Sequence, residues 1–130
     1  MDIVIDFDGT CVTHEYPAIG REIGATKVLQ ELADAGHRLI LFTIRSNGKK
    51  KNNRTLDEAV EWFRERNIPL FGVQKHPEQH LWTFSPKAYG DIYIDDAALG
   101  CPLMIPKTDE RPYVDWKTVR KLLKEKGLLS

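Results

Sequence analysis

Four aspartates in two spacings are the residues of this sequence best suited to chemistry. Asp6 and Asp8 are separated by one residue, and Asp95 and Asp96 are adjacent. Alternate residues of an extended segment point the same way, so Asp6 and Asp8 can flank one reacting centre. One carboxylate can then attack phosphorus while the other gives and takes a proton. If all four gather in one place, they repel each other and need a cation, and hard oxygen ligands suit Mg²⁺.

Neutral and basic residues elsewhere in the chain could assist such a reaction. The hydroxyl of Thr43 and the ammonium of Lys87 can hold phosphoryl oxygens and offset the charge that builds up in transfer. Lys75 is the alternative to Lys87 for this role. Arg45 follows Thr43 by two positions, and we expect it to contact the substrate. Gly9 lets the backbone turn sharply and approach a ligand closely.

These residues must be positioned by regular elements, and the hydrophobic pattern predicts them. Short apolar runs rich in β-branched residues predict strands, and apolar residues at helical spacing predict helices. The predicted strands are 3–7, 38–43, 70–73 and 91–95, with a further short one at 102–105, and the predicted helices are 23–35, 55–66 and 116–126. Residues 74–90 contain two prolines and a glycine and predict an irregular stretch. Alternating strands and helices predict an α/β domain with a mainly parallel sheet.

The strand ends are where the candidate residues lie. Asp6 and Asp8 end the first predicted strand, Thr43 ends the second, and Asp95 and Asp96 end the fourth. In open parallel sheets, ligands bind outside the carboxyl ends of the strands. We therefore expect these side chains to converge on one edge of the sheet.

Bulk properties limit the function classes. A chain of 130 residues, 42% hydrophobic and 29% charged, predicts one domain over residues 1–130. Basic and acidic residues number 19 each, so net charge gives no reason to expect binding to nucleic acid or to a membrane surface. No signal peptide pattern and no apolar run of the ~20 residues that span a bilayer is present, so we expect a cytoplasmic protein without a membrane partner. Cys11 and Cys101 are expected to be free thiols.

Four motifs together resemble the haloacid dehalogenase-like (HAD) superfamily. DFDGT at the end of the first strand resembles that family's DxDGT motif, and LFT resembles its second motif, an apolar run that ends in Thr or Ser. Lys87 resembles the third motif, and IYIDD resembles the DD form of the fourth. All four occur in the family order, and the resemblance covers residues 3–96.

The resemblance implies a fold, a reaction and a cofactor. The fold would be a three-layer sandwich with a mainly parallel central sheet of Rossmann-like type. Asp6 would be the nucleophile of a phosphatase, with Asp8 as the general acid and base. Mg²⁺ would bind the Asp6 carboxylate, the Asp8 backbone carbonyl and one of Asp95 or Asp96, with Asp96 favoured. Thr43 and Lys87 would bind the phosphoryl group.

The chain departs from many members of that superfamily because it has no room for a cap domain. Residues 11–22 can hold only a short flap, and residues 46–86 are used by a helix, a strand and a loop. We expect either a neighbouring subunit in a homo-oligomer or the substrate itself to cover the open site. Lys49 to Lys51 would then bind an anionic substrate at the mouth. The substrate would be a small phosphorylated molecule or a phosphorylated polymer end.

Three other functions use similar residues. A signalling receiver domain also has aspartates around Mg²⁺, but its acidic pair follows the first strand, whereas here the acidic pair follows the fourth. A HAD scaffold without catalysis would not need Asp6, Asp8 and Asp96 intact. Phosphotransfer on the same scaffold remains the alternative to hydrolysis.

Overall fold

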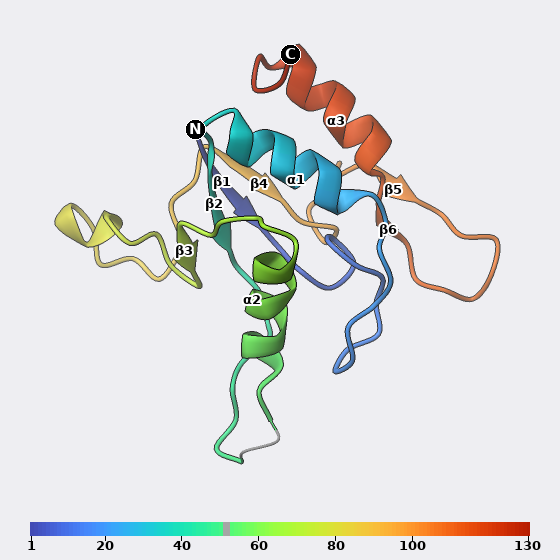
Figure 1. Cartoon of the computed structure of the whole chain (residues 1–130), viewed down its shortest axis with the longest axis horizontal. Coiled ribbons are helices and arrows are strands. Elements are labelled where there is room, and N and C mark those ends of the chain that lie inside the picture. Colours follow the sequence, from blue (N-terminus) through green and yellow to red (C-terminus); the bar gives the residue numbers. More distant parts are fainter. Residues whose placement is uncertain (51–52) are drawn as a thin grey trace.

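The computed structural model describes residues 1–50 and 53–130, which form an α/β structure (Figure 1). The third of the three lysines at 49–51 therefore lies outside the described residues. The elements in chain order are β1 (Asp2–Ile5), α1 (Ala25–Asp34), β2 (Arg38–Leu41), α2 (Thr55–Glu65), β3 (Gly72–Val73), the 3₁₀ turn η1 (Gln79–Leu81), β4 (Ile92–Ile94), β5 (Leu103–Met104), β6 (Tyr113–Val114) and α3 (Trp116–Glu125). Every predicted strand and helix is confirmed with shorter bounds, except that β1 begins one residue earlier than predicted, and β6 was not predicted.

The main sheet has the strand order β3-β2-β1-β4 and is parallel throughout. The prediction of a mainly parallel sheet is therefore confirmed. The fifth predicted strand, β5, lies outside this sheet and pairs antiparallel with β6 as a separate hairpin. No helix in the described part of the chain is long and apolar enough to cross a membrane.

The two faces of the sheet are covered differently. Ile3, Ile5, Leu39 and Leu41 face one side and share a core with the buried residues of α1, α2 and α3. Figure 1 shows α1 and α2 over the same side of the sheet, with α3 beside α1. On the other face, the buried cluster holds three residues, Val4, Ile40 and Ala88. A second helical layer, as a three-layer sandwich would have, is not seen among the described residues.

The segment between β3 and β4 covers that second face of the sheet. It contains the short turn η1 and no α-helix among the residues described, and its Ala88 packs on Val4 and Ile40. At the amino ends of the strands, His76 Nε2 lies 2.8 Å from Asp2 Oδ2 and so ties the segment to β1. The Arg38 guanidinium donates hydrogen bonds to the same carboxylate and holds the pKa of Asp2 below its ordinary value.

Candidate active site

The carboxyl ends of β1 and β4 bring three aspartates together. Asp6 follows β1, and its N–H donates to the carbonyl of Ile94 at 3.1 Å, which sets the two strand ends side by side. Asp95 and Asp96 follow directly. Asp6, Asp95 and Asp96 each offer an oxygen atom, and these atoms lie within 4.8 Å of one another. The predicted convergence of the acidic pair on Asp6 is confirmed.

Thr10 connects two of these carboxylates. Its hydroxyl lies 2.8 Å from Asp6 Oδ2 and 3.2 Å from Asp96 Oδ1, and it accepts from the N–H of Asp96 at 3.0 Å. The loop that carries Thr10 is fixed from outside the sheet, because Trp116 Nε1 donates to the Thr10 carbonyl at 2.7 Å. Sequence reasoning assigned Thr10 no role of its own, although it stands inside the DFDGT motif.

Gly9 is required at its position for reasons of space. Its φ is +80°, and a Cβ there would lie 2.0 Å from His14 Nε2 and 2.6 Å from Asp96 Oδ2. His14 in turn places Nε2 2.9 Å from Asp96 Oδ2. Gly9 therefore lets His14, in the loop after β1, reach the acidic cluster.

The electrostatics of Asp6 reflect this crowding. Burial, followed by the negative charge of Asp95 and a hydrogen bond to Asp96, raises the pKa of Asp6 to about 8. The hydrogen bond from Thr10 opposes this shift. An ionised Asp6 is therefore disfavoured unless positive charge enters the cluster.

Asp8 is held apart from the cluster by an ion pair. The Arg45 guanidinium donates from Nε to Asp8 Oδ2 and from Nη2 to Asp8 Oδ1, both at 2.8 Å. Arg45 also donates to the carbonyls of Pro17 and Ala18 in the flap and of Thr55 at the start of α2. Both carboxylate oxygens of Asp8 thus accept hydrogen bonds from Arg45.

The prediction that Arg45 contacts the substrate does not match this structure. Its side chain has no exposed surface, and its cation lies 5.1 Å from the ring centroid of Phe7 and 5.2 Å from that of Tyr16. A buried cation needs a counter-charge, and Asp8 supplies it. The spacing of two residues after Thr43 could not reveal this partner, which is 37 positions away.

Thr43 is positioned by a residue that sequence reasoning did not consider. The Gln74 side chain accepts from the Thr43 N–H at 2.8 Å and donates to the Thr43 carbonyl at 2.7 Å and to the Arg45 carbonyl at 3.1 Å. Gln74 adopts a left-handed conformation, with φ +66°. The Thr43 hydroxyl accepts from the N–H of Arg45 at 3.1 Å, so its own hydrogen is available to another acceptor.

The predicted lysines do not join the aspartates. Lys87 is exposed, and its Nζ lies 5.8 Å from the ring centroid of Tyr93, over a separate cavity near η1. Lys75 is also exposed and does not line the acidic cavity. Lys49 and Lys50 are exposed in the loop before α2, and neither lines the acidic cavity.

One cavity of about 600 Å³ contains the aspartates. Its lining comes from the strand ends, the flap and the β5–β6 loop, and consists of Asp6, Asp8, His14, Tyr16, Phe42, Thr43, Ile44, Asp95, Asp96, Ala97 and Arg111. Arg111 is the one arginine or lysine in this described lining. Nothing in its sequence surroundings indicated a place at the site, since it follows Asp96 by 15 positions and belongs to no motif.

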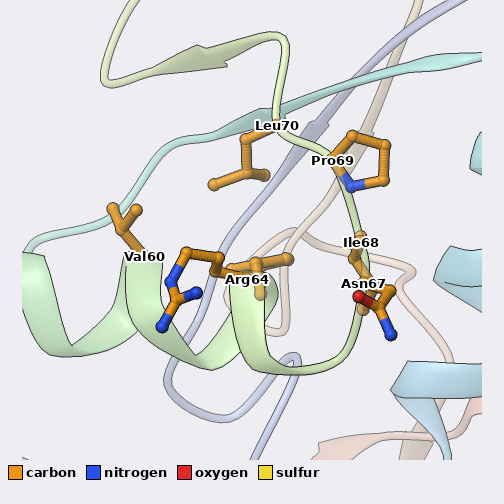
Figure 2. Close-up of a pocket in the computed structure, with 7 residues that line it drawn as sticks. Val60, Arg64, Asn67, Ile68, Pro69 and Leu70 are labelled. Carbon is orange, nitrogen blue, oxygen red and sulfur yellow. The ribbon is translucent and has the colours of Figure 1, made fainter.

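A second cavity, of about 470 Å³, lies between α2 and the segment that leads to β3 (Figure 2). Figure 2 shows Val60 and Arg64 on α2 and Pro69 and Leu70 on the following segment. Its lining is mostly apolar and includes no carboxylate, histidine or cysteine. It therefore offers no nucleophile or acid.

No protein-family model and no curated protein matches this chain. A solved structure, described as that of a conserved protein coded by a locus from Bacteroides thetaiotaomicron, is similar to it. The two are 41% identical over 97% of this chain and 91% of that one, with a TM-score of 0.74. The chain belongs to the same family as that conserved protein. The description gives that protein no activity, so the likeness supports the fold and leaves the chemistry to be inferred from the site.

Proposed function

We propose that this chain is a magnesium-dependent phosphatase of the HAD type, which hydrolyses phosphate monoesters through an aspartyl phosphate on Asp6. The observation that carries the proposal is the meeting of Asp6, Asp95 and Asp96 within 4.8 Å, in the same cavity as Asp8 and Thr43. These residues come from three separate motifs, at the ends of β1, β2 and β4, and the reaction requires them to meet at one edge of the sheet.

The donor set fits a hard divalent cation. Three carboxylates share one small volume, and the raised pKa of Asp6 indicates that its ionised form lacks a compensating charge. Oxygen ligands of this kind suit Mg²⁺. Asp6 and Asp96, with the backbone carbonyl of Asp8, would hold the ion, and Asp95 would lie beside it. When bound, the ion would neutralise the carboxylates and the phosphoryl oxygens.

The protein's own residues then divide the reaction in two. In the first step, an Asp6 oxygen forms a bond to phosphorus, the ester P–O bond breaks, and Asp8 gives its proton to the departing oxygen. In the second, water attacks the phosphorus of the aspartyl phosphate, Asp8 takes the proton, and phosphate leaves. Protonation of Asp8 weakens its paired hydrogen bonds from Arg45, and the carboxylate form restores them.

Thr43 completes the proposed machinery. Its hydroxyl hydrogen is not used by Arg45 and can be donated to a phosphoryl oxygen. Lys87 has no part in this reaction, because it does not line the cavity. We infer that the site has no cap domain and is bordered instead by the flap and the β5–β6 loop.

The test is phosphate release from a panel of phosphate monoesters with Mg²⁺. We expect turnover that disappears with chelator and in Asp6→Asn, which also reports any contaminating phosphatase. Asp8→Asn should lose roughly 10²–10⁴-fold on an alkyl ester and much less on nitrophenyl phosphate, whose leaving group departs without a proton. Full activity after exhaustive chelation, or in Asp6→Asn, would sink the proposal.

A further inference from the structure

We propose that Arg111 selects the substrate by binding a second anionic group on the part of a phosphate monoester that leaves. This inference rests on the proposed phosphatase function and names its substrate class. The substrate would carry a phosphoryl group at one end and a carboxylate or second phosphate at the other.

The backbone around Arg111 is held in place on both sides. The preceding residue, Glu110, receives two hydrogen bonds from the Arg21 guanidinium, one of them at 2.8 Å, which ties the β5–β6 loop to the loop after β1. The same guanidinium lies 5.7 Å from the ring centroid of Tyr113 in β6. Val114, which follows Tyr113 in β6, donates its N–H to the Gly9 carbonyl at 2.9 Å. Arg111 therefore projects from a loop that is anchored to the catalytic motif itself.

The cavity needs a positively charged side chain that is free to bind an anionic substrate, and Arg111 can supply it. Four aspartates line the cavity, and an anionic substrate entering it needs positive charge besides the metal ion. The Arg45 cation is buried against Asp8, and Lys87 lies over another cavity. Arg111 forms no ion pair with any residue of 1–50 or 53–130. Its planar guanidinium can bind a carboxylate or a phosphate through two parallel hydrogen bonds.

The exposure of Arg111 assigns it to the leaving part of the substrate. Asp6 and Thr43 are partly buried and follow strands of the main sheet, whereas Arg111 comes from a hairpin outside that sheet and is exposed. Two exposed apolar side chains, Tyr16 and Ile44, line the cavity as well, with 57% and 90% of their surface accessible. A carbon skeleton between two anionic groups fits a cavity that combines these partly buried groups with exposed apolar side chains and an exposed cation.

Matched pairs of esters test the inference. Benzyl phosphate carries one anionic group, 4-carboxybenzyl phosphate adds a carboxylate, and 1,4-xylylene bisphosphate adds a second phosphate. We expect the wild-type protein to show a KM roughly 10-fold lower for the doubly anionic esters, the size of one charge-assisted interaction.

Arg111→Ala should abolish this preference by raising KM for those esters, with kcat little changed. Arg111→Lys should keep part of it as a point charge. Arg64→Ala, at an exposed arginine on α2 outside this cavity, is the control and should change nothing.

Other outcomes overturn the inference. An equal rise in KM for all three esters in Arg111→Ala would place Arg111 on the transferred phosphoryl group, and unchanged constants would remove it from the site. If the wild-type protein hydrolyses none of the esters, the phosphatase proposal fails by itself. The binding of benzylphosphonate and 4-carboxybenzylphosphonate with Mg²⁺, measured by calorimetry, then decides the inference: a preference for the carboxylated ligand that Arg111→Ala removes supports it, and equal affinities contradict it.

Discussion

At the residue scale, the ionisation of Asp6 links the candidate site to stability. The ordinary value for an aspartate is 3.8, and burial beside Asp95 raises the pKa of Asp6 to about 8. Between these values the folded chain holds a proton on Asp6 that the unfolded chain has lost. Without metal, this stabilisation is complete at low pH and is lost as pH rises through the folded value, so Asp6 makes the free energy of unfolding fall from about pH 4 to pH 8.

Asp6→Asn should remove this contribution, because an amide does not ionise. In chelator at pH 8 we expect the variant to melt about 3–8 °C above the wild type, which corresponds to one or two kcal/mol for a domain of this size. Thermal melts at several pH values measure the difference. Mg²⁺ should raise the melting temperature of the wild type more at pH 8 than at pH 5, since the ion binds the carboxylate form. Asp34→Asn, at an exposed aspartate at the end of α1, is the control. Identical pH profiles for wild type and Asp6→Asn would contradict the raised pKa.

At the element scale, the loops after β2 and β3 act as one unit through Gln74. A single amide side chain satisfies the N–H and carbonyl of Thr43 and the carbonyl of Arg45. These two residues carry the hydroxyl that we propose binds phosphate and the guanidinium that holds Asp8. The loop after β3 thus positions both groups although it contributes no atom to the described lining of the cavity.

Gln74→Ala should therefore impair catalysis as well as stability. We expect kcat/KM to fall roughly 10–100-fold, because a displacement of about 1 Å in a reacting group has effects of that size. The free energy of unfolding should fall by about 1–3 kcal/mol, from the lost hydrogen bonds. Gln30→Ala offers a matched control, since its amide donates to the Arg66 carbonyl and touches neither loop. Steady-state kinetics and urea unfolding of both variants decide the matter, and equal kinetic losses would mean that Gln74 has no special relation to the site.

At the scale of the whole molecule, the sheet is unequally protected. Its helix-covered face holds most of the buried apolar residues, including Phe63, which has no exposed surface. The segment over the other face exposes large apolar side chains, with Leu81, Trp82 and Phe84 at 77%, 65% and 96% of their surface. Stability should thus depend almost entirely on one face.

Two phenylalanine substitutions test this asymmetry. Phe63→Ala should lower the free energy of unfolding by about 3–5 kcal/mol, because it opens a cavity in a packed core. Phe84→Ala should change it by less than about 0.5 kcal/mol, since an exposed side chain loses few contacts. Urea denaturation at several protein concentrations makes the measurement. A large, concentration-dependent effect of Phe84→Ala would instead reveal that a second copy of the chain covers this segment.

The sequence by itself determined the order of the elements and the gathering of the aspartates. Hydrophobic periodicity is local, and parallel strands place their carboxyl ends at one edge, so Asp6, Asp95 and Asp96 could be assigned to one site without coordinates. The helix at 116–126 could also be predicted, because its apolar residues recur at helical spacing. In the structure, Asp115 caps this helix by accepting a hydrogen bond from the N–H of Thr118.

The tertiary structure alone decided which partner each charged side chain meets. Arg45 was expected to contact the substrate and instead pairs with Asp8, Lys87 was expected in the site and lies over Tyr93, and Arg111 lines the cavity without any motif. Long, flexible side chains reach several ångströms in any direction. Their partners therefore depend on how segments far apart in the chain pack, such as the β5–β6 loop, which the Arg21–Glu110 ion pair holds beside the loop after β1.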